Sequence, residues 1–373
     1  MKTVFDVIVL GLGAMGSASA CHLARAGKRV LGLDRFTPPH VFGSSHGQTR
    51  IIREAYLEHP AYVPLIQRAY DLWHELESEA GRQLFLRTGG LMIGKPESAV
   101  VAGAKRSAEG HNLRHEILSA GEVKQRFPAL VPGEEMIAVW EPRAGILFPE
   151  ACVESHLMLA RRYGATLRFN EPVTRWEPDG DGVRVFTADS VFLGSHLVLA
   201  AGPWIRSLLF DVNFPFSVER QIQFWFEPCS NHEQFGPERC PIHIWEQGPG
   251  GFFYGFPDLG NGVKVARHHE GELTDPEKLR RDVEPEEIDS MRELLRRFLP
   301  QAGGALRSTA VCMYTNMPDF HFFIDHHPRH RQVLIVSPCS GHGFKFSSVI
   351  GEIVGELIGE GRSRLDLSLF RRR

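Results

Sequence analysis

The chain has 373 residues, 43% of them hydrophobic and 23% charged, a composition typical of a globular protein large enough for two lobes. Its formal net charge of −3 excludes a global basic field that would hold nucleic acid or an anionic membrane surface, so we expect neither partner. The six cysteines are scattered, without CxxC pairs or metal-ligand spacing, which predicts free thiols, a cytoplasmic setting and no metal site.

The first predicted elements are a strand, a helix and a second strand. The apolar residues 7–10 lead directly into glycines, which indicates a buried strand and not a signal or membrane segment. Residues 14–27 are rich in Ala, Ser and Leu and predict a closely packed helix. Residues 30–33 predict a parallel strand that ends at Asp34.

The turn between the first strand and the helix fits a dinucleotide-binding pattern. Gly11, Gly13 and Gly16 form GxGxxG, and Asp34 follows at the end of the second strand. In this pattern the first glycine makes a tight turn, the second lets a pyrophosphate approach the backbone, and the third lets the helix pack on the sheet. The helix N-terminus would bind the phosphates, and Asp34 the ribose hydroxyls. The pattern alone does not separate FAD from NAD.

The rest of the chain predicts strands between glycine or proline breaks, with helices between them. Expected strands cover residues 84–93, 135–140, 217–226, 242–247, 251–256, 262–268 and 332–337. Expected helices cover residues 62–79, 97–109, 150–163, 284–298 and 346–358, with a hairpin turn at 179–182 and a glycine turn at 341–343. Residues 197–204 predict a late apolar strand whose small-residue turn could return to the nucleotide site, which favours FAD.

These elements predict an α/β fold of two interleaved lobes, with helix-linked strands at both chain ends around a strand-rich centre. We expect an FAD-binding, Rossmann-like lobe from residues 1–85, 142–216 and 312–373. A substrate lobe on a mixed β-sheet with helices would comprise residues 86–141 and 217–311.

Three further segments stand out: residues 44–53 (SSHGQTRIIR), 312–316 (CMYTN) and 340–347 (SGHGFKFS). Together with the glycine pattern, and in this order, they resemble the monomeric sarcosine oxidase family, which includes N-methyltryptophan oxidase. The resemblance covers nearly the whole chain. It implies FAD-dependent oxidation of an N-methyl amino acid such as sarcosine to an imine, with hydride transfer to the flavin. Reoxidation by O2 would give hydrogen peroxide, and hydrolysis of the imine would give formaldehyde and the free amino acid.

The resemblance also implies a set of cofactor-binding residues and a monomeric protein. In this sequence the set is Gly11, Gly13, Gly16, Asp34, Ser44, His46, Arg50, Val173, Gly202, Cys312, Gly341, Gly343 and Lys345. Cys312 matches the residue that binds the flavin covalently through an 8α thioether, which requires an accessible thiolate. One alternative is that Cys312 is an ordinary buried thiol. Another is that Cys339, close to the segment 340–347, and not Cys312, is the residue that binds the flavin.

For the substrate, the resemblance assigns Arg53 and Lys345 as the pair that binds the carboxylate, while Arg50 lies beside the flavin. An arginine fork fixes the orientation of a carboxylate, and a lysine adds a point charge. The alternative for Arg53 is a surface salt bridge to Glu54 or Glu58.

Lys264 matches the oxygen-activating lysine of the family, and His268 matches an active-site histidine; with Arg50 they form the expected catalytic group. The strand period places Lys264 and His268 on one face. Tyr254 and Tyr314 are expected to line the substrate cavity and exclude water, although core packing is the alternative for both.

Two departures leave the preferred side chain of the substrate open. Phe320 stands where the family pattern has an acidic residue, and the aromatic region 229–245, which we expect near the substrate entrance, matches no motif. Other functions remain: a flavin dehydrogenase, an oxidase of N-methyltryptophan, a cyclic imino acid, a D-amino acid or glycine, and a nucleotide-binding module without turnover. The cations Arg53, Lys264 and Lys345 argue against the last of these.

Overall fold

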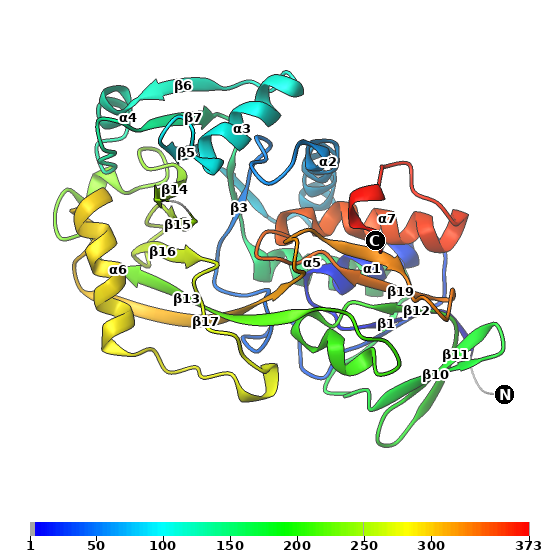
Figure 1. The fold of residues 1–373 in the computed structure, drawn as a ribbon. Helices are drawn as coiled ribbons and strands as arrows, with labels where there is room; N and C mark the ends of the chain where they lie inside the picture. Colours follow the sequence, from blue (N-terminus) through cyan, green and yellow to red (C-terminus); the bar gives the residue numbers. More distant parts are fainter. Residues whose placement is uncertain (1–3, 249, 373) are drawn as a thin grey trace.

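In the computed structural model, residues 4–248 and 250–372 are described, and their strands form two eight-stranded sheets and a small three-stranded one. Figure 1 shows the two large sheets as neighbouring parts of the molecule, with α6 outside one and α1, α2, α5 and α7 against the other. This arrangement confirms the expected α/β fold class.

The first sheet contains the predicted β1–turn–α1–β2 unit. β1 (Val4–Leu10) pairs in parallel with β2 (Val30–Leu33) on one side and with β12 (Val191–Leu199) on the other. The sheet is completed by β9 (Thr166–Arg168), β10 (Arg175–Asp179), β11 (Gly182–Phe186), β18 (Phe323–His326) and β19 (Val333–Ser337). β10 and β11 form the hairpin that the turn at 179–182 predicts.

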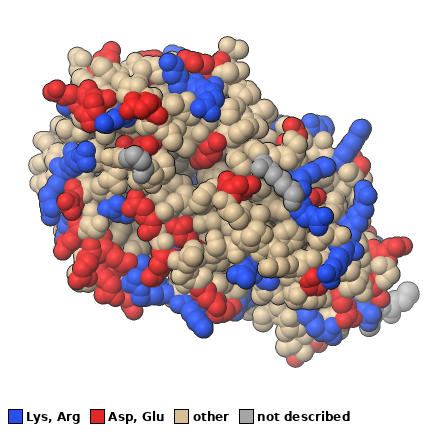
Figure 2. All heavy atoms as spheres, in the orientation of Figure 1, with Lys and Arg blue, Asp and Glu red and all other residues tan. Residues whose placement is uncertain are grey.

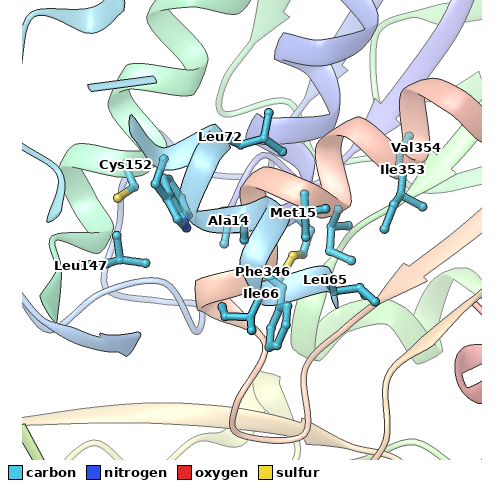
Figure 3. Close-up of a cluster of buried hydrophobic side chains, with 14 of the residues drawn as sticks. Ala14, Met15, Leu65, Ile66, Leu72, Leu147, Cys152, Phe346, Ile353 and Val354 are labelled. Atoms are coloured by element: carbon cyan, nitrogen blue, oxygen red, sulfur yellow. The ribbon is translucent and has the colours of Figure 1, made fainter. Parts of the chain in front are cut away.

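Helices from distant parts of the sequence cover the inner face of this sheet. They are α1 (Ala14–Arg25), α2 (Val63–Ala80), α5 (Pro149–Arg162) and α7 (Ser347–Glu360). Figure 3 shows how their apolar side chains interlock, with Met15 of α1 among Leu65 and Ile66 of α2 and Ile353 of α7. This core fixes the N-terminal end of α1, where the glycine turn lies.

The second sheet comes from the centre of the chain. Its strands are β5 (Gly90–Gly94), β6 (Glu116–Ser119), β7 (Ile137–Glu141), β13 (Ser217–Phe226), β14 (Ile242–Gly248), β15 (Gly251–Phe256), β16 (Val263–His268) and β17 (Leu306–Asn316). α6 (Pro285–Phe298) packs Phe298 against Trp245 and Phe253 of this sheet. α3 (Ala99–Gly110) and α4 (Ala120–Arg126) lie near β5, β6 and β7 (Figure 1).

β13 and β17 connect the two parts of the molecule. They pair antiparallel from Ser217 and Asn316 at one end to Phe226 and Leu306 at the other, and Figure 1 shows this long ribbon extending from the second sheet toward the first. The sequence interpretation did not identify β17 as a strand. Cys312 and Tyr314 therefore stand on a rigid strand and not in a loop.

One predicted strand, 84–93, is wrong as a single element. The structure divides it into β4 (Phe85–Arg87) and β5, with Gly89 between them at φ +70°. A side chain at Gly89 would lie 1.9 Å from the ring of Trp140, so the chain can turn there only because the residue is glycine. β4 joins the small sheet with β3 (Arg50–Ile52) and β8 (Gly145–Leu147).

Candidate active site

A cavity of about 830 Å³ extends between the first and second sheets. Its wall includes residues from the glycine turn, from segment 44–58, from β15 and β17, and from the turn before α7. Cavities of this size hold cofactors and small substrates. Most of the residues that the sequence singles out meet here, although they come from both ends and the centre of the chain.

The glycine turn closes one end of the cavity and requires its glycines. Gly11 has φ +84°, and a Cβ there would lie 2.6 Å from the carbonyl oxygen of Ala200. A Cβ on Gly16 would lie 1.7 Å from the carbonyl oxygen of Gly11, so Gly16 sets the distance between α1 and the turn. Gly11 and Gly13 line the cavity together with Ala14 and Met15 of the first turn of α1, where the positive end of the helix dipole favours a phosphate.

Asp34 is fixed at the same end by two backbone hydrogen bonds. Its Oδ2 accepts the N–H of Leu12 at 2.7 Å, and its Oδ1 accepts the N–H of Phe36 at 2.8 Å. The carboxylate retains lone pairs toward the cavity, where a ribose hydroxyl can donate. The glycine turn, the helix amides and this carboxylate together fit the adenine dinucleotide part of FAD.

The late strand returns to this site as the sequence predicts. β12 pairs with β1, and Ala200, Ala201 and Gly202 beyond its end line the cavity. Val173, from the loop before β10, lies in the same wall.

The middle of the cavity contains Ser44 and Arg50, with Cys312 behind them. Arg50 donates from Nη2 to the carbonyl oxygen of Ser44 at 2.9 Å, and the Sγ of Cys312 lies 3.8 Å from the same Nη2. Ser44, Arg50 and Met313 line the cavity, whereas Cys312 is buried immediately behind that wall. Cys339 lines the cavity instead, and burial raises the pKa of its thiol to about 11.

Arg53 and Lys345 also line the cavity, close enough for the charge of Arg53 to act on Lys345. Arg53 is buried, and its Nη2 donates to both carboxylate oxygens of Glu58 at 2.7 and 2.9 Å. The salt bridge to Glu58 therefore exists, but it lies in the cavity wall and not on the outer surface, while Glu54 pairs with Arg143. Sequence reasoning missed this location, because nothing in the order of residues shows that Glu58 lies in the wall of a cavity.

Burial and charge set the protonation of this group. Burial alone would raise the pKa of Glu58, but Arg53, His342 and Lys345 outweigh it and lower that pKa to about 2. Burial and then Arg53 lower the pKa of Lys345 to about 7, against the attraction of Glu58. Two cationic side chains and one anionic side chain thus share this part of the cavity.

Tyr254, Tyr314 and His268 surround the space next to these charges, and all three line the cavity. The hydroxyl of Tyr314 lies 3.2 Å from Nδ1 of His268. Burial, followed by the charge of His269, lowers the pKa of His268 well below its ordinary value, so this imidazole is neutral. Gly341 and Gly343 also line the cavity. Gly341 has φ +76°, and a Cβ there would lie 2.7 Å from the Tyr314 ring, so this position requires glycine.

Lys264 is buried next to this site without lining the cavity. Its Nζ donates to the carbonyl oxygens of Gly47 at 2.7 Å and Thr49 at 3.0 Å. Burial and then Arg50 lower its pKa well below the ordinary value. His46 is also buried outside the cavity wall, and burial followed by Arg50 lowers its pKa to about 3.

The two departures also have places in the structure. Phe320 lines the cavity, is 48% exposed and packs against His269 with ring centroids 4.6 Å apart. Within residues 229–245, Ile244 lines the cavity, whereas Phe235 and Trp245 are buried in the core under α6. That region therefore contributes more to the core than to an entrance.

Elsewhere in the described residues, Asp211, His327 and His330 form one group whose donor atoms could hold a metal ion. Nε2 of His327 already lies 3.1 Å from Oδ1 of Asp211, and its Nδ1 accepts the N–H of Arg329 at 3.3 Å. Because Nδ1 of His327 accepts a hydrogen bond, the proton of this imidazole lies on Nε2, where it faces Asp211. A metal ion in this group would need Nε2 without its proton. Within residues 4–248 and 250–372, no helix is both long and apolar enough to cross a membrane.

Comparison with known proteins gives consistent matches over the whole chain. The family model described as FAD dependent oxidoreductase matches residues 6–357. A monomeric sarcosine oxidase of Streptomyces avermitilis is 46% identical over 99% of this chain and 97% of its own. An N-methyl-L-tryptophan oxidase of Salmonella arizonae is 36% identical over 98% of both chains. Among solved structures, NikD, an unusual amino acid oxidase essential for nikkomycin biosynthesis, has a TM-score of 0.86 at 24% identity and covers 100% of this chain and 98% of its own.

Proposed function

The chain belongs to the FAD dependent oxidoreductases, within the monomeric sarcosine oxidase family and its N-methyltryptophan oxidase relatives, and from this premise we propose that it oxidises sarcosine or a related N-methyl amino acid. It is an FAD-dependent oxidase whose substrate is a small amine that carries a carboxylate. The proposed products are hydrogen peroxide, formaldehyde and the free amino acid.

One observation carries the choice of a carboxylate-bearing substrate. Arg53 and Lys345 are buried and line the cavity, and Arg53 already holds the carboxylate of Glu58 through two hydrogen bonds. A site that accepts an internal carboxylate in this geometry has the donors to accept one from a ligand. We propose that the substrate carboxylate takes the place of Glu58 on Arg53, with Lys345 as the second contact.

When bound, FAD would supply the acceptor for the hydride of the N-methyl carbon and would pass the two electrons on to O2, giving hydrogen peroxide. The residues of the chain position the substrate for this step. Anchoring the carboxylate fixes the direction of the N-methyl group, and Tyr254 and Tyr314 exclude water around the amine. The neutral His268 adds no positive charge, so the site favours the neutral amine that oxidation requires.

We assign the oxygen half of the reaction to Lys264. An ammonium group buried beside the flavin ring would stabilise the negative charge that develops on O2 during electron transfer. Lys264 lies near Arg50, which we assign beside the ring, and its two carbonyl contacts hold Nζ in one place.

The FAD contacts are proposed residue by residue. Gly11, Gly13 and the amides of α1 would bind the pyrophosphate, Asp34 the ribose, and Val173 and Gly202 the adenosine end. Ser44, Arg50, Gly341, Gly343 and Lys345 would surround the flavin, with a thioether from Cys312, and His46 would support this segment from outside the cavity wall. The proximity of Cys312 to the cavity residues Ser44 and Arg50 supports that bond.

We further propose the lobe boundaries given by the sequence, with residues 1–85, 142–216 and 312–373 as the FAD lobe and residues 86–141 and 217–311 as the substrate lobe. A monomer in the cytoplasm is the proposed working form. All six cysteines are free thiols, which supports a reducing setting.

The test is a flavin spectrum of the purified protein, acid precipitation of one sample, and addition of sarcosine in air to another. We expect a yellow pellet and peroxide formed with sarcosine. A colourless pellet would contradict covalent attachment alone. Absence of peroxide with sarcosine and with every other N-methyl amino acid tried would contradict the proposed activity, and glycine, proline and D-amino acids would then be the next substrates to test.

A further inference from the structure

Two carboxylates, Glu150 and Glu141, hold the segment that carries the arginines of the site. Glu150 is in the first turn of α5, and Glu141 is the last residue of β7. Each accepts the N–H groups of two successive residues in segment 44–58. We propose that Glu150 positions Lys264 for the oxygen half of the reaction, and that Glu141 positions Arg53 for substrate binding. This inference rests on the proposed function.

Glu150 acts on the turn that holds Lys264. Its Oε1 accepts the N–H of Gly47 at 2.8 Å and of Gln48 at 3.0 Å. The carbonyl oxygens of Gly47 and Thr49, on either side of Gln48, are the two acceptors of Lys264 Nζ. One carboxylate therefore fixes the peptide groups that fix the ammonium.

This turn does not hold its shape by preference. Gly47 has φ +99° and Gln48 has φ +70°, a conformation that is unfavourable for a glutamine. The two hydrogen bonds to the carboxyl oxygen of Glu150 offset that cost. Without them the turn is free to relax, and Lys264 loses its defined position.

Glu141 acts on the peptide groups directly after Arg53. Its Oε1 accepts the N–H of Glu54 at 2.7 Å, and its Oε2 accepts the N–H of Ala55 at 2.8 Å. The carbonyl oxygen of Ala55 in turn accepts Nη1 of Arg53 at 2.8 Å. Glu141 thus fixes the peptide group that holds Nη1, while Nη2 donates to the carboxylate of Glu58, the contact that we propose a substrate carboxylate replaces.

Glu150 and Glu141 each stand on a rigid element, whereas the residues whose N–H groups they accept belong to the irregular segment 44–58. β7 is paired on both sides, with β5 and β6, and α5 packs against α1. Rigid support of this kind is what keeps a reactive group in place. If the two carboxylates only stabilised the fold, replacing either one would weaken substrate binding and reoxidation together. If they position Lys264 and Arg53, each replacement should affect only one of these two steps.

The experiment compares Glu150→Ala with Glu141→Gln, and uses Glu154→Gln, an exposed carboxylate on the same helix as Glu150, as the control. Flavin reduction by substrate without oxygen and reoxidation of the reduced enzyme by O2 are measured separately. For Glu150→Ala we expect reoxidation about tenfold slower with reduction little changed, as for the loss of charge-assisted hydrogen bonds. For Glu141→Gln we expect a substrate dissociation constant about tenfold higher with reoxidation little changed, because an amide nitrogen replaces one of the two oxygens that accept N–H groups.

Glu150→Gln keeps an oxygen that can accept both N–H groups, so its reoxidation rate should lie between those of the alanine variant and the wild type. If Glu141→Gln does not fold, Glu141→Asp, which keeps both oxygens on a shorter side chain, replaces it. Hydrogen exchange gives a readout that needs no turnover: the amides of Gly47 and Gln48 should exchange faster in Glu150→Ala, and those of Glu54 and Ala55 in Glu141→Gln.

Equal loss of both half-reactions in either variant, or no local change in exchange, would overturn the inference. A wild-type protein without oxidase activity would instead overturn the proposed function. In that case the exchange pattern alone would decide whether the two carboxylates position the segment.

Discussion

The positive charge of Arg53 is compensated by a neighbouring carboxylate, and a bound substrate would change this arrangement of charges. Glu58 keeps Arg53 neutralised in the free protein, and Lys345 lies close enough for both of them to affect its pKa. A ligand carboxylate would bring a negative charge to the same place. Its binding should therefore depend on the protonation of Lys345.

Binding of a simple carboxylate should weaken as the pH rises through about 7. Burial lowers the pKa of Lys345 to about 7, so the ammonium is present below that pH and is lost above it. The dissociation constant of acetate, which has no amine to titrate, should increase about tenfold between pH 6 and 9, the effect of losing one charged contact. Titration of the flavin spectrum would measure it. In Lys345→Gln the dependence should disappear, and an unchanged slope in that variant would remove Lys345 from the anchor.

Lys264→Met tests the oxygen assignment. Methionine keeps the length of the side chain but removes the charge that would stabilise developing negative charge on O2. Reoxidation should slow about 100-fold, as for removal of an electrostatic donor in other enzymes, while reduction by substrate changes little. Stopped-flow measurement of the two half-reactions separates these effects. Unchanged reoxidation would take that role from Lys264.

Cys312→Ser tests the covalent bond. A hydroxyl cannot form the thioether, so FAD should become extractable with acid and turnover should fall strongly. Absorbance of the supernatant and the pellet after precipitation measures this. Flavin that stays bound to the precipitated variant would locate the bond elsewhere, with Cys339, in the cavity wall, as the first alternative.

At the scale of elements, the sequence predicts what local geometry dictates. The unit β1–α1–β2 is predicted because the spacing of its glycines is typical of a single kind of turn. β13 and β15 have the predicted bounds because glycine or proline residues flank their apolar runs. The split at Gly89 could not be predicted, since it depends on the ring of Trp140 from another strand. The roles of Glu141 and Glu150, and the location of Glu58 in the cavity wall, were missed for the same reason, because packing sets the partners of these carboxylates.

The contact of α1 with α7 depends on one glycine. A Cβ on Gly351 would lie 2.7 Å from the backbone carbon and oxygen of Ala18, whereas the nearest atom to one on Gly355 is 3.8 Å away. Gly351→Ala should destabilise the protein by about 1–3 kcal/mol through overpacking. Gly355→Ala should be neutral or stabilising, because alanine favours a helix by about 1 kcal/mol. Thermal unfolding of both variants compares them, and equal shifts would mean that the helices can move apart at no cost.

At the scale of the whole molecule, the second part reaches over the dinucleotide end of the cavity. Glu277 accepts hydrogen bonds from Arg35 at 2.5 Å and from Nε1 of Trp204 at 2.8 Å, and Arg281 donates to the carbonyl oxygen of Val41. Arg35, Trp204 and Glu277 all line the cavity. On the face shown in Figure 2, Lys and Arg side chains and Asp and Glu side chains both occur, and neither sign covers the whole face.

Cofactor release should therefore require segment 275–281 to separate from the loop that follows β2. In the Cys312→Ser background, where FAD can leave, adding Glu277→Ala should increase the dissociation rate of FAD by about fivefold or less, the effect of an exposed ion pair. Flavin fluorescence after dilution would measure the rate. The same rate in both proteins would mean that FAD leaves by another route.

The order of the strands along the chain has a consequence for biosynthesis. β1 and α1 are made first, but the partners that enclose them, β19 beside β12 and α7 against α1, are made last. On the ribosome, the glycine turn therefore lacks its supporting core until about residue 360 has left the exit tunnel. Until then the apolar side of α1 is exposed and can bind chaperones. We therefore expect FAD to bind only after α7 has folded onto α1, so that the order of the elements along the chain sets when the cofactor can be bound.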